Sequence, residues 1–483
     1  MAFAVFKRRA LRTCLLALLP AAGFSVYAAD ENPTLSGGDT TFTGANHRSP
    51  FSQPAANLTL ERRMDFVLGE AIFEKIWVPS PSSTTASDGL GPLHNARSCS
   101  QCHINDGRGH PLNGENDRLA SLLRLSVPAN TPERMREAEI NGLAGDPVYG
   151  GQLQPFAVAG LPPEGRVDLS YETHSVELAD GTEFELRKPV VRVIQPGYGE
   201  FDPALRSSFR IAPPMIGLGL LEQIPAERLE ALADPDDQDG DGISGRINRV
   251  YDRTSDSMQI GRFGWKAGQP TLAQQNASAL NNDIGIGNPI YTAASGGCTE
   301  RQPACLNQLH GNTAQQGGFE ASPEMVRVLE FYTAMLAVPA AREQSHPEVR
   351  KGRRLFNQIG CAGCHTPSHR TADGVDSNTE FPELAAQTIF PYTDLLLHDM
   401  GPGLADEHSE FSASGPEWRT PPLWGLGLTQ AVGGATYYLH DGRARSLPEA
   451  ILWHGGEAER AKQQFSQLDK VDRSALIRFL ESL

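Results

Sequence analysis

The pentapeptide Cys361-Ala-Gly-Cys364-His365 has a twin earlier in the chain, at Cys99-Ser-Gln-Cys102-His103. C-x-x-C-H is the attachment pattern of c-type haem, in which both thiols bond to the haem vinyl groups and the adjacent histidine binds the iron. A single copy would also fit half of a zinc site or a redox dithiol. Two copies behind a secretory signal favour two covalent haem c groups, with His103 and His365 as iron ligands.

The N-terminus has the three parts of a secretory signal peptide. Basic residues lie between Lys7 and Arg12, an apolar run follows over residues 15–24, and Val26-Tyr-Ala28 fits a cleavage site of small residues. The apolar run is shorter than the ~20 residues that cross a membrane, and no later run is long enough. We therefore expect residues 1–28 to be removed and the mature protein to be periplasmic, without a membrane span.

The net charge of the chain limits the kinds of partner it can bind. The 483-residue chain has a formal net charge of −16, which argues against nucleic acid and anionic lipid. An acidic surface would suit a basic redox partner, although it also simply keeps an exported protein soluble.

Of the seven cysteines, Cys14 lies in the signal and four belong to the two motifs. The remaining pair, Cys298 and Cys305, predicts a disulfide in an oxidising compartment, and the alternative is a reactive dithiol.

A short repeat precedes the two motifs. Gly69-Glu-Ala-Ile-Phe73 stands before the first and Gly352-Arg-Arg-Leu-Phe356 before the second. Apolar residues at helical spacing predict a helix around the first copy and a closing helix over 467–483. We expect a mainly α fold with long loops: two cytochrome c-like helical haem domains, an N-terminal one over 29–340 and a C-terminal one over 341–483.

Two features between the motifs exceed what such domains need. Residues 166–195 alternate apolar and polar side chains with Asp180-Gly at the tip, which predicts a β-hairpin inserted in the N-terminal half. Asp237, Asp239 and Asp241 take positions 1, 3 and 5 of an EF-hand-type loop, and Asn248 stands at position 12. This spacing of hard oxygen ligands favours Ca²⁺, and the alternative is an acidic turn in water.

Several stretches resemble a known group of haem proteins. The order Trp265, Gln275, Asp283 is similar to the Phe-Trp-Asp-Gly-Arg, Gln and Glu of bacterial di-haem cytochrome c peroxidases and their relative MauG. The di-haem oxidoreductase family, also labelled thiol oxidoreductases, matches further stretches, which are Gly-Leu-Gly-Leu-Leu-Glu (217–222), Asp-Gly-Ile-Ser-Gly-Arg (241–246), Leu-Leu-Leu-His-Asp-Met-Gly (395–401) and Leu-Trp-His-Gly-Gly (452–456). The resemblance covers most of the mature chain.

The resemblance implies different work for the two haems. The haem on His103 would react with H₂O₂ or O₂, and the haem on His365 would relay electrons from a small redox protein. His454 matches the position of the methionine that is the sixth ligand of the peroxidases' C-terminal haem. A histidine there would lower the reduction potential, because imidazole donates more strongly than thioether. The alternatives for this ligand are Met400, His398 and His440.

The resemblance also implies the residues of the peroxide site. Asp283 matches the peroxidases' catalytic glutamate, although it is one carbon shorter and two residues closer to the glutamine. It would move the proton that makes O–O cleavage heterolytic, and Glu222 is the alternative acid. Gln275 would hydrogen-bond the distal ligand. Trp265 would be an electron bridge between the haems, or only a core aromatic residue.

A calcium ion lies between the haems of the peroxidases, with an asparagine upstream of the tryptophan as a ligand. Asn248 fits that position, so it forms either one site with Asp237, Asp239 and Asp241 or a second site. We therefore expect an exported di-haem peroxidase-like oxidoreductase with two haem c groups and calcium.

Two alternatives stay open: MauG-like oxidation of a protein substrate, and a non-enzymatic di-haem electron carrier. A carrier needs two six-coordinate irons, and the distal candidates for the first haem are His94, His110 and His174. A thiol oxidoreductase would require Cys298 and Cys305 to be free.

Overall fold

The structure is a computed structural model that describes residue 1 and residues 33–44, 49–84, 87–111, 120–374, 378 and 380–483. The predicted signal peptide therefore lies outside the described residues, apart from Met1. Pro33–Leu483 form one unit by their contacts, and the predicted division near residue 340 stays a prediction. Within the described ranges, no helix is long and apolar enough to cross a membrane.

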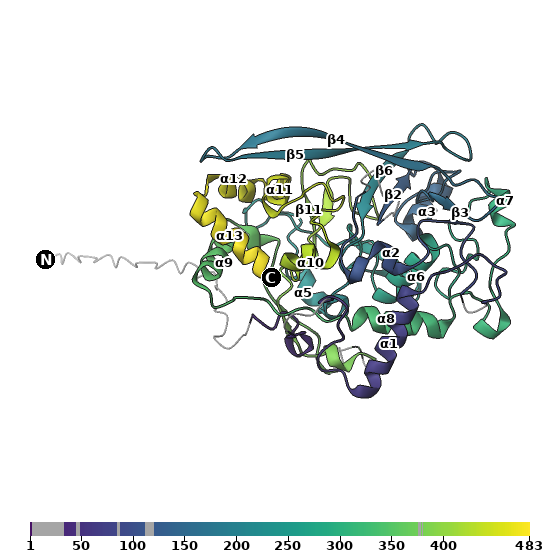
Figure 1. Ribbon diagram of the computed structural model, residues 1–483. Helices are drawn as coiled ribbons and strands as arrows, with labels where there is room; N and C mark the ends of the chain where they lie inside the picture. The colour runs from purple at the N-terminus through teal and green to yellow at the C-terminus, as the bar shows by residue number, and fades with distance from the viewer. Residues whose placement is uncertain (2–32, 45–48, 85–86, 112–119, 375–377, 379) are drawn as a thin grey trace. The chain divides into compact units, whose positions relative to one another are not determined.

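Helices and strands alternate irregularly along the described residues (Figure 1). The helices are α1 (Leu60–Glu74), α2 (Cys99–Cys102), α3 (Pro132–Asn141), α4 (Leu218–Glu222), α5 (Ala226–Glu230), α6 (Leu272–Asn282), α7 (Pro303–Leu306), α8 (Pro323–Ala334), α9 (Pro347–Gln358), α10 (Thr429–Gly433), α11 (Leu447–Leu452), α12 (Glu459–Gln467) and α13 (Lys470–Ser482). The strands are β1 (Leu93–His94), β2 (Ser121–Ser126), β3 (Phe156–Ala157), β4 (Arg166–Glu177), β5 (Glu183–Ile194), β6 (Arg206–Ile211), β7 (Arg249–Asp252), β8 (Ser257–Ile260), β9 (His369–Arg370), β10 (Thr388–Ile389), β11 (Leu397–Asp399) and β12 (Glu417–Arg419).

The prediction of a mainly α fold of two cytochrome c-like domains is wrong. Helices make up 31% of the described residues and strands 17%, and the strands pair as two-stranded antiparallel sheets. One such sheet joins β2 to β6, with Ser121 opposite Ile211, and another joins β11 to β12. These ladders connect segments that are distant in sequence, and strands of two to six residues show too few alternations to be recognised.

A pair of packed helices lies beside each motif. Helix α1 packs on α8 beside the first motif, and α9 packs on α13 beside the second. A glycine lies at each crossing. A Cβ on Gly69 would lie 2.5 Å from that of Tyr332, and a Cβ on Gly352 would lie 2.6 Å from that of Phe479. In each repeat, the final phenylalanine packs on the residue that faces the glycine. The ring centroids of Phe73 and Tyr332 are 5.3 Å apart, and those of Phe356 and Phe479 are 5.5 Å apart. The short repeat therefore encodes one helix crossing twice.

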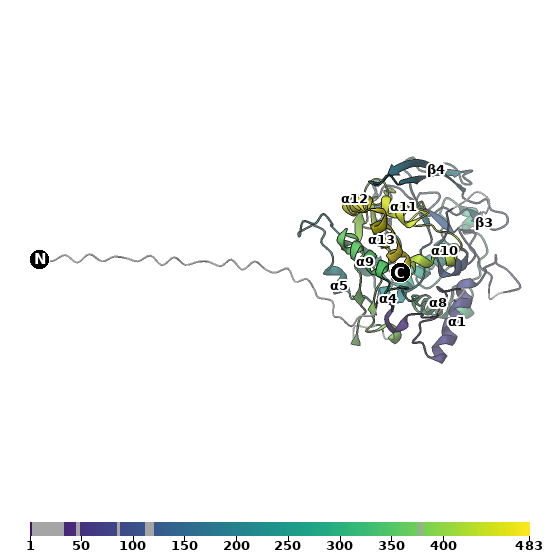
Figure 2. The same ribbon diagram turned by 60° about the vertical axis from the view of Figure 1, so that its left-hand side comes forward.

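The predicted hairpin over 166–195 is confirmed, since β4 and β5 pair antiparallel along their whole length. The hairpin lies in the N-terminal half of the sequence, as expected, and it also contacts elements from the C-terminal part. The hairpin lies along α11 and α12 (Figures 1 and 2). Nε of Arg187 donates to the carbonyl of Arg443 at 2.9 Å, and Arg473 pairs with Asp180 at 2.6 Å. The hairpin thus covers elements that follow the second motif.

Two large apolar clusters form the core of the described residues. The first includes Phe73, Leu272 and Tyr332 and packs against Cys99. The second includes Phe356 and the inner face of the hairpin, and it packs against Cys361. Each haem motif therefore borders a core of its own, and burial of these side chains is the main stabilising contribution around it.

Candidate functional site

Each motif forms a single helical turn, although the turns differ in type. The second forms the 3₁₀ turn η4 (Cys361–Gly363) directly after α9, and Gly360, with φ +94°, ends that helix in the left-handed region that favours glycine. The first motif forms the short helix α2. In each motif the histidine N–H donates to the carbonyl of the first cysteine at 3.0 Å. Both cysteines and the histidine of a motif are thus held on one turn, as attachment to a single haem requires.

The two motif histidines are also oriented alike. Nδ1–H of His103 donates to the carbonyl of Pro213 at 2.8 Å, and Nδ1–H of His365 donates to that of Tyr392 at 2.9 Å. The phenylalanines of the short repeat lie 6.1 and 6.3 Å from the two rings, tilted by 51° and 55°. Burial lowers the pKa of both imidazoles to about 4. Each ring is therefore neutral, and its Nε2 lone pair is available to an iron.

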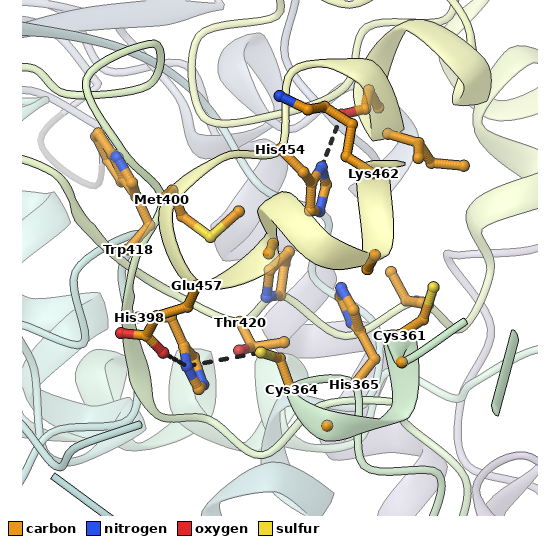
Figure 3. A pocket seen from close by; sticks show the side chains of 18 of the residues that line it. Cys361, Cys364, His365, His398, Met400, Trp418, Thr420, His454, Glu457 and Lys462 are labelled. Atoms are coloured by element: carbon orange, nitrogen blue, oxygen red, sulfur yellow. Dashed lines mark hydrogen bonds and ion pairs between the residues drawn. The ribbon is translucent and has the colours of Figure 1, made fainter. Parts of the chain in front are cut away.

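A cavity of about 470 Å³ lies beside the second motif. Figure 3 shows Cys361, Cys364 and His365 on one side of it and His454 on the opposite side. Nδ1–H of His454 donates to the carbonyl of Ala450 at 2.8 Å. Two imidazoles with available Nε2 atoms thus line one cavity from two sides, as a haem with two histidine ligands would require.

The charges of this cavity fit a haem as well. Arg108 and Arg419 line it, and burial lowers the pKa of both guanidinium groups to about 10. Nη1 of Arg108 is buried and has no hydrogen-bond partner among the described residues. The propionates of a haem would supply that partner, because carboxylates pair well with guanidinium groups. The residues present therefore fit the group that the motif predicts.

His398, one alternative for the sixth ligand, is hydrogen-bonded to two carboxylates. The ring N–H groups of His398 donate to Asp394 at 2.9 Å and to Glu457 at 2.7 Å. Burial alone would lower the pKa of His398, but these hydrogen bonds raise it well above its ordinary value. An imidazolium with two N–H donors has no lone pair for iron. The other two alternatives also line the cavity, and one of them, His440, lies flat on Trp418 with ring centroids 3.6 Å apart.

Asp283 lies where α6 ends, next to the first motif. Its main-chain carbonyl accepts the N–H groups of residues 95–96, which lead into Cys99. Its Oδ1 accepts a hydrogen bond from Nε2 of Gln152 at 2.7 Å. Burial raises the pKa of Asp283, while Gln152 and the charge of Arg124 lower it. The predicted acid is thus placed beside the first pair of cysteines.

Glu222 lies at the other end of the same helix. Its Oε1 accepts the N–H of Leu272, the first residue of α6, at 2.8 Å. At 1.5 Å per residue, α6 separates Glu222 from Asp283 by roughly 15 Å. Gln275 is half-buried in the first turns of α6. The two candidate acids therefore cannot serve the same haem face, and Asp283 is the one near the first motif.

Trp265 lines the cavity of the second motif. Its Nε1–H donates to the carbonyl of Ile211 at 2.8 Å, and the guanidinium of Arg108 lies 5.8 Å from its ring. Arg108 follows His103 closely in the chain. The segment after the first motif therefore meets Trp265 at the wall of the cavity beside the second motif, which is called the second cavity below. An electron bridge would need this position, and that role stays a prediction.

A comparison with protein families identifies the class of protein to which the chain belongs. The family model described as "Di-haem oxidoreductase, putative peroxidase" matches residues 31–483. The chain belongs to this family. Among solved structures, this di-haem oxidoreductase is similar to the hydrazine synthase of Kuenenia stuttgartiensis pressurised with xenon, at 14% identity over 77% of this chain and 95% of that one. The TM-score is 0.27, which is too low to carry an argument. No curated protein matches the chain.

In the acidic loop of the di-haem oxidoreductase, the carboxylates that lie close together are not the predicted calcium ligands alone. Carboxylate oxygens of Asp234, Asp237 and Asp239 lie within 4.8 Å of one another. Asp241 instead lines the second cavity. Because Asp234 lies just outside the EF-hand-type pattern, the spacing alone did not indicate it.

Asn248 is engaged elsewhere. Its Nδ2 donates to the carbonyls of Lys266 and Glu410 at 2.8 and 3.1 Å. Its Oδ1 accepts from N and Oγ of Ser412 at 3.1 and 2.8 Å. Both lone pairs of the amide oxygen are therefore used, and none remains for a metal ion. The calcium-ligand role that the resemblance implies for Asn248 does not fit this arrangement.

Cys298 and Cys305 form the predicted disulfide. Among the described residues, the free cysteines are the four of the haem motifs. Outside the haem motifs, the described part of the chain therefore offers no free pair of thiols for thiol chemistry.

The polar residues that support the second cavity were missed from the sequence. Arg108, Trp418, Arg419 and Glu457 all line it, yet they come from segments before and after the second motif. Glu457 directly follows the family-like stretch 452–456, which was the available signal for it. A single sequence carries no information on which of these distant segments meet.

Proposed function

We propose that this di-haem oxidoreductase is exported to the periplasm and reduces H₂O₂ at the first motif, with electrons that arrive through the second. One observation carries the proposal. The two motifs hold their histidines alike, but the second cavity presents His454 opposite His365, whereas the structure brings the carboxyl of Asp283 to the first motif. A second imidazole suits electron transfer, and a carboxyl suits proton transfer.

The chain's own contribution at the first motif is proton handling. When bound, the haems supply peroxide coordination at the first motif and electron storage at the second. Reduction of H₂O₂ to two waters consumes two electrons and two protons. Gln152 holds Oδ1 of Asp283, so Oδ2 is the atom that would take the peroxide proton and return it to the leaving oxygen. Burial raises the pKa of Asp283 above that of an exposed aspartate, which favours a group that both accepts and releases a proton.

Electron supply and calcium belong to the same proposal. A small redox protein would be the donor, and Trp265 would connect the motifs from the wall of the second cavity. Asp234, Asp237 and Asp239 would bind Ca²⁺, because three carboxylates so close together repel one another unless a cation lies between them. O₂ is the alternative oxidant, and nucleic acid is not an expected partner.

Low-temperature EPR of the oxidised holoprotein tests the proposal. We expect a high-spin ferric signal, or one that appears after one equivalent of reductant, beside a low-spin bis-histidine signal. Added H₂O₂ should remove the high-spin signal. Two low-spin signals that persist through half-reduction and peroxide would instead identify an electron carrier. Loss of the signal with H₂O₂ but no steady turnover with a reduced donor would favour MauG-like oxidation of a protein substrate.

A further inference from the structure

A lysine ammonium lies in the interior of the protein, close to the wall of the second cavity. Lys266 directly follows Trp265, and its side chain is 0% exposed. Its three N–H donors meet main-chain carbonyl oxygens, those of Ser414, Gly415 and Glu417, at 2.7, 3.0 and 3.0 Å. Oδ1 of Asp406 lies 3.1 Å from Nζ. Three carbonyl oxygens and one carboxylate form a ligand set that hard cations such as Ca²⁺ prefer.

The same segment is held from a second side by Asn248. Its amide group bonds to Glu410 and Ser412, and also to the carbonyl of Lys266 itself. Residues 406–417 thus close around Lys266 and Asn248 together. This is the junction where the resemblance to the peroxidases implies a calcium ion, and the cation found there is the lysine.

Two cations, Lys266 and Arg210, and two carboxylates, Asp406 and Glu410, lie at this junction, with Arg210 2.8 Å from Glu410. Burial lowers the pKa of Lys266 to about 8, while Asp406 raises it, so the ammonium is mostly charged at neutral pH. The guanidinium of Arg210 lies near as well, with Nη2 at 3.7 Å from Asp406. A divalent ion placed beside these two cations would be repelled in a medium of low polarity. The peroxidases have aspartate directly after the matching tryptophan, and this chain has lysine there.

We propose that Lys266 is a built-in cation that takes the place of a metal ion at the junction of Asn248 with residues 406–417, so that this junction needs no divalent metal. Lys266 is a positioning residue: its ammonium lies 4.2 Å from the ring of Trp418, which stacks on His440 in the wall of the second cavity. The N–H of Arg419 also donates to the carbonyl of Trp265 at 2.9 Å. The inference does not depend on the substrate of the protein.

The first test uses chelation and leaves Lys266 intact. Asp239→Asn removes one of the three carboxylates of the acidic loop and so weakens calcium binding there. We expect EGTA to leave the low-spin absorption of the second haem in Asp239→Asn holoprotein unchanged. A shift of that absorption on chelation, reversed by added calcium, would place a metal at the junction and overturn the proposal.

The second test removes the ammonium. In the Asp239→Asn background, Lys266→Ala leaves a space lined by the three carbonyls and Asp406, whereas Lys266→Met fills the space without charge. Millimolar Ca²⁺ should raise the Tm of the alanine variant by about 3 °C or more, the shift expected when a ligand binds the folded state alone. The methionine variant should not respond. A response that is equal in both variants, or absent from both, would refute the idea of a cation cage. If Lys266→Ala does not fold, the chelation test still decides.

Discussion

The surroundings of His103 and His365 are alike on one side and different on the other. Each histidine donates Nδ1–H to a carbonyl and faces the phenylalanine of a helix crossing. Beyond this shared part, the second motif meets His454 and the first meets Asp283. The shared part comes from a repeated local sequence, and the difference comes from distant segments. The attachment unit can thus be duplicated as a whole, while the chemistry is set by what packs against it.

The strongest way to break this comparison is to remove one motif histidine at a time. His103→Gly should abolish peroxide turnover, because the first haem loses its protein ligand, and should keep the low-spin spectrum of the second. His365→Gly, the matched variant, should lose that low-spin spectrum. Steady-state peroxidase assays and absorption spectra measure both. Turnover that survives His103→Gly would mean that peroxide reacts at the second motif.

The second prediction separates the two carboxyl groups at the opposite ends of α6, those of Asp283 and Glu222. Asp283→Asn should slow the reaction with peroxide by ~10²-fold or more, the usual effect of losing a general acid–base. Glu222→Gln is the matched control and should retain the rate, since Glu222 caps the far end of the helix. Stopped-flow mixing with H₂O₂ gives both rates. The reverse result would transfer the proton-transfer role to Glu222.

The pH profile sharpens the same assignment. The base form of Asp283 exists above its pKa and is lost as the pH falls through it. Burial raises this pKa, so the rate should begin to fall at a higher pH than a solvent-exposed aspartate would give. Asp283→Asn should remove this acid limb. A limb that persists unchanged in the variant would belong to another group.

The third prediction concerns His454. His454→Met should raise the reduction potential of the second haem by on the order of 0.1 V, because thioether donates less than imidazole and axial ligands set potentials over a range of ≈ 0.8 V. Potentiometric titration measures the shift. His440→Phe should leave the potential nearly unchanged, since its ring is stacked on Trp418. A larger shift in His440→Phe than in His454→Met would exchange their roles.

The contrast between local sequence patterns and packing by distant segments also explains what the sequence could predict. The motifs, the short repeat and the hairpin of residues 166–195 are local patterns, and each was recognised. His454 and Asp283 came only from the resemblance to a family. The strand content was missed because ladders such as β2–β6 join distant segments. Nor could spacing show that Asn248 bonds to Ser412 and that Lys266 lies among carbonyls, since a single sequence does not say which loops meet.

The last and smallest effect tests whether the two crossings are independent units. Gly69→Ala would press a methyl group against Tyr332 and the carbonyl of Val328, and Gly352→Ala would press one against Phe479 and the carbonyl of Ala475. Overpacking costs about 1–3 kcal/mol, offset by the ~1 kcal/mol that alanine gains over glycine in a helix.

We expect a modest fall in Tm for both variants, larger for Gly352→Ala because a main-chain carbonyl is its nearest obstacle. The sharper measurement is which haem spectrum changes. Gly69→Ala should disturb the haem on His103 and Gly352→Ala the haem on His365, since each crossing touches one histidine through its phenylalanine. If either variant disturbs both haems equally, the repeat is not a local unit, and the likeness of the two motifs would have to come from the fold as a whole.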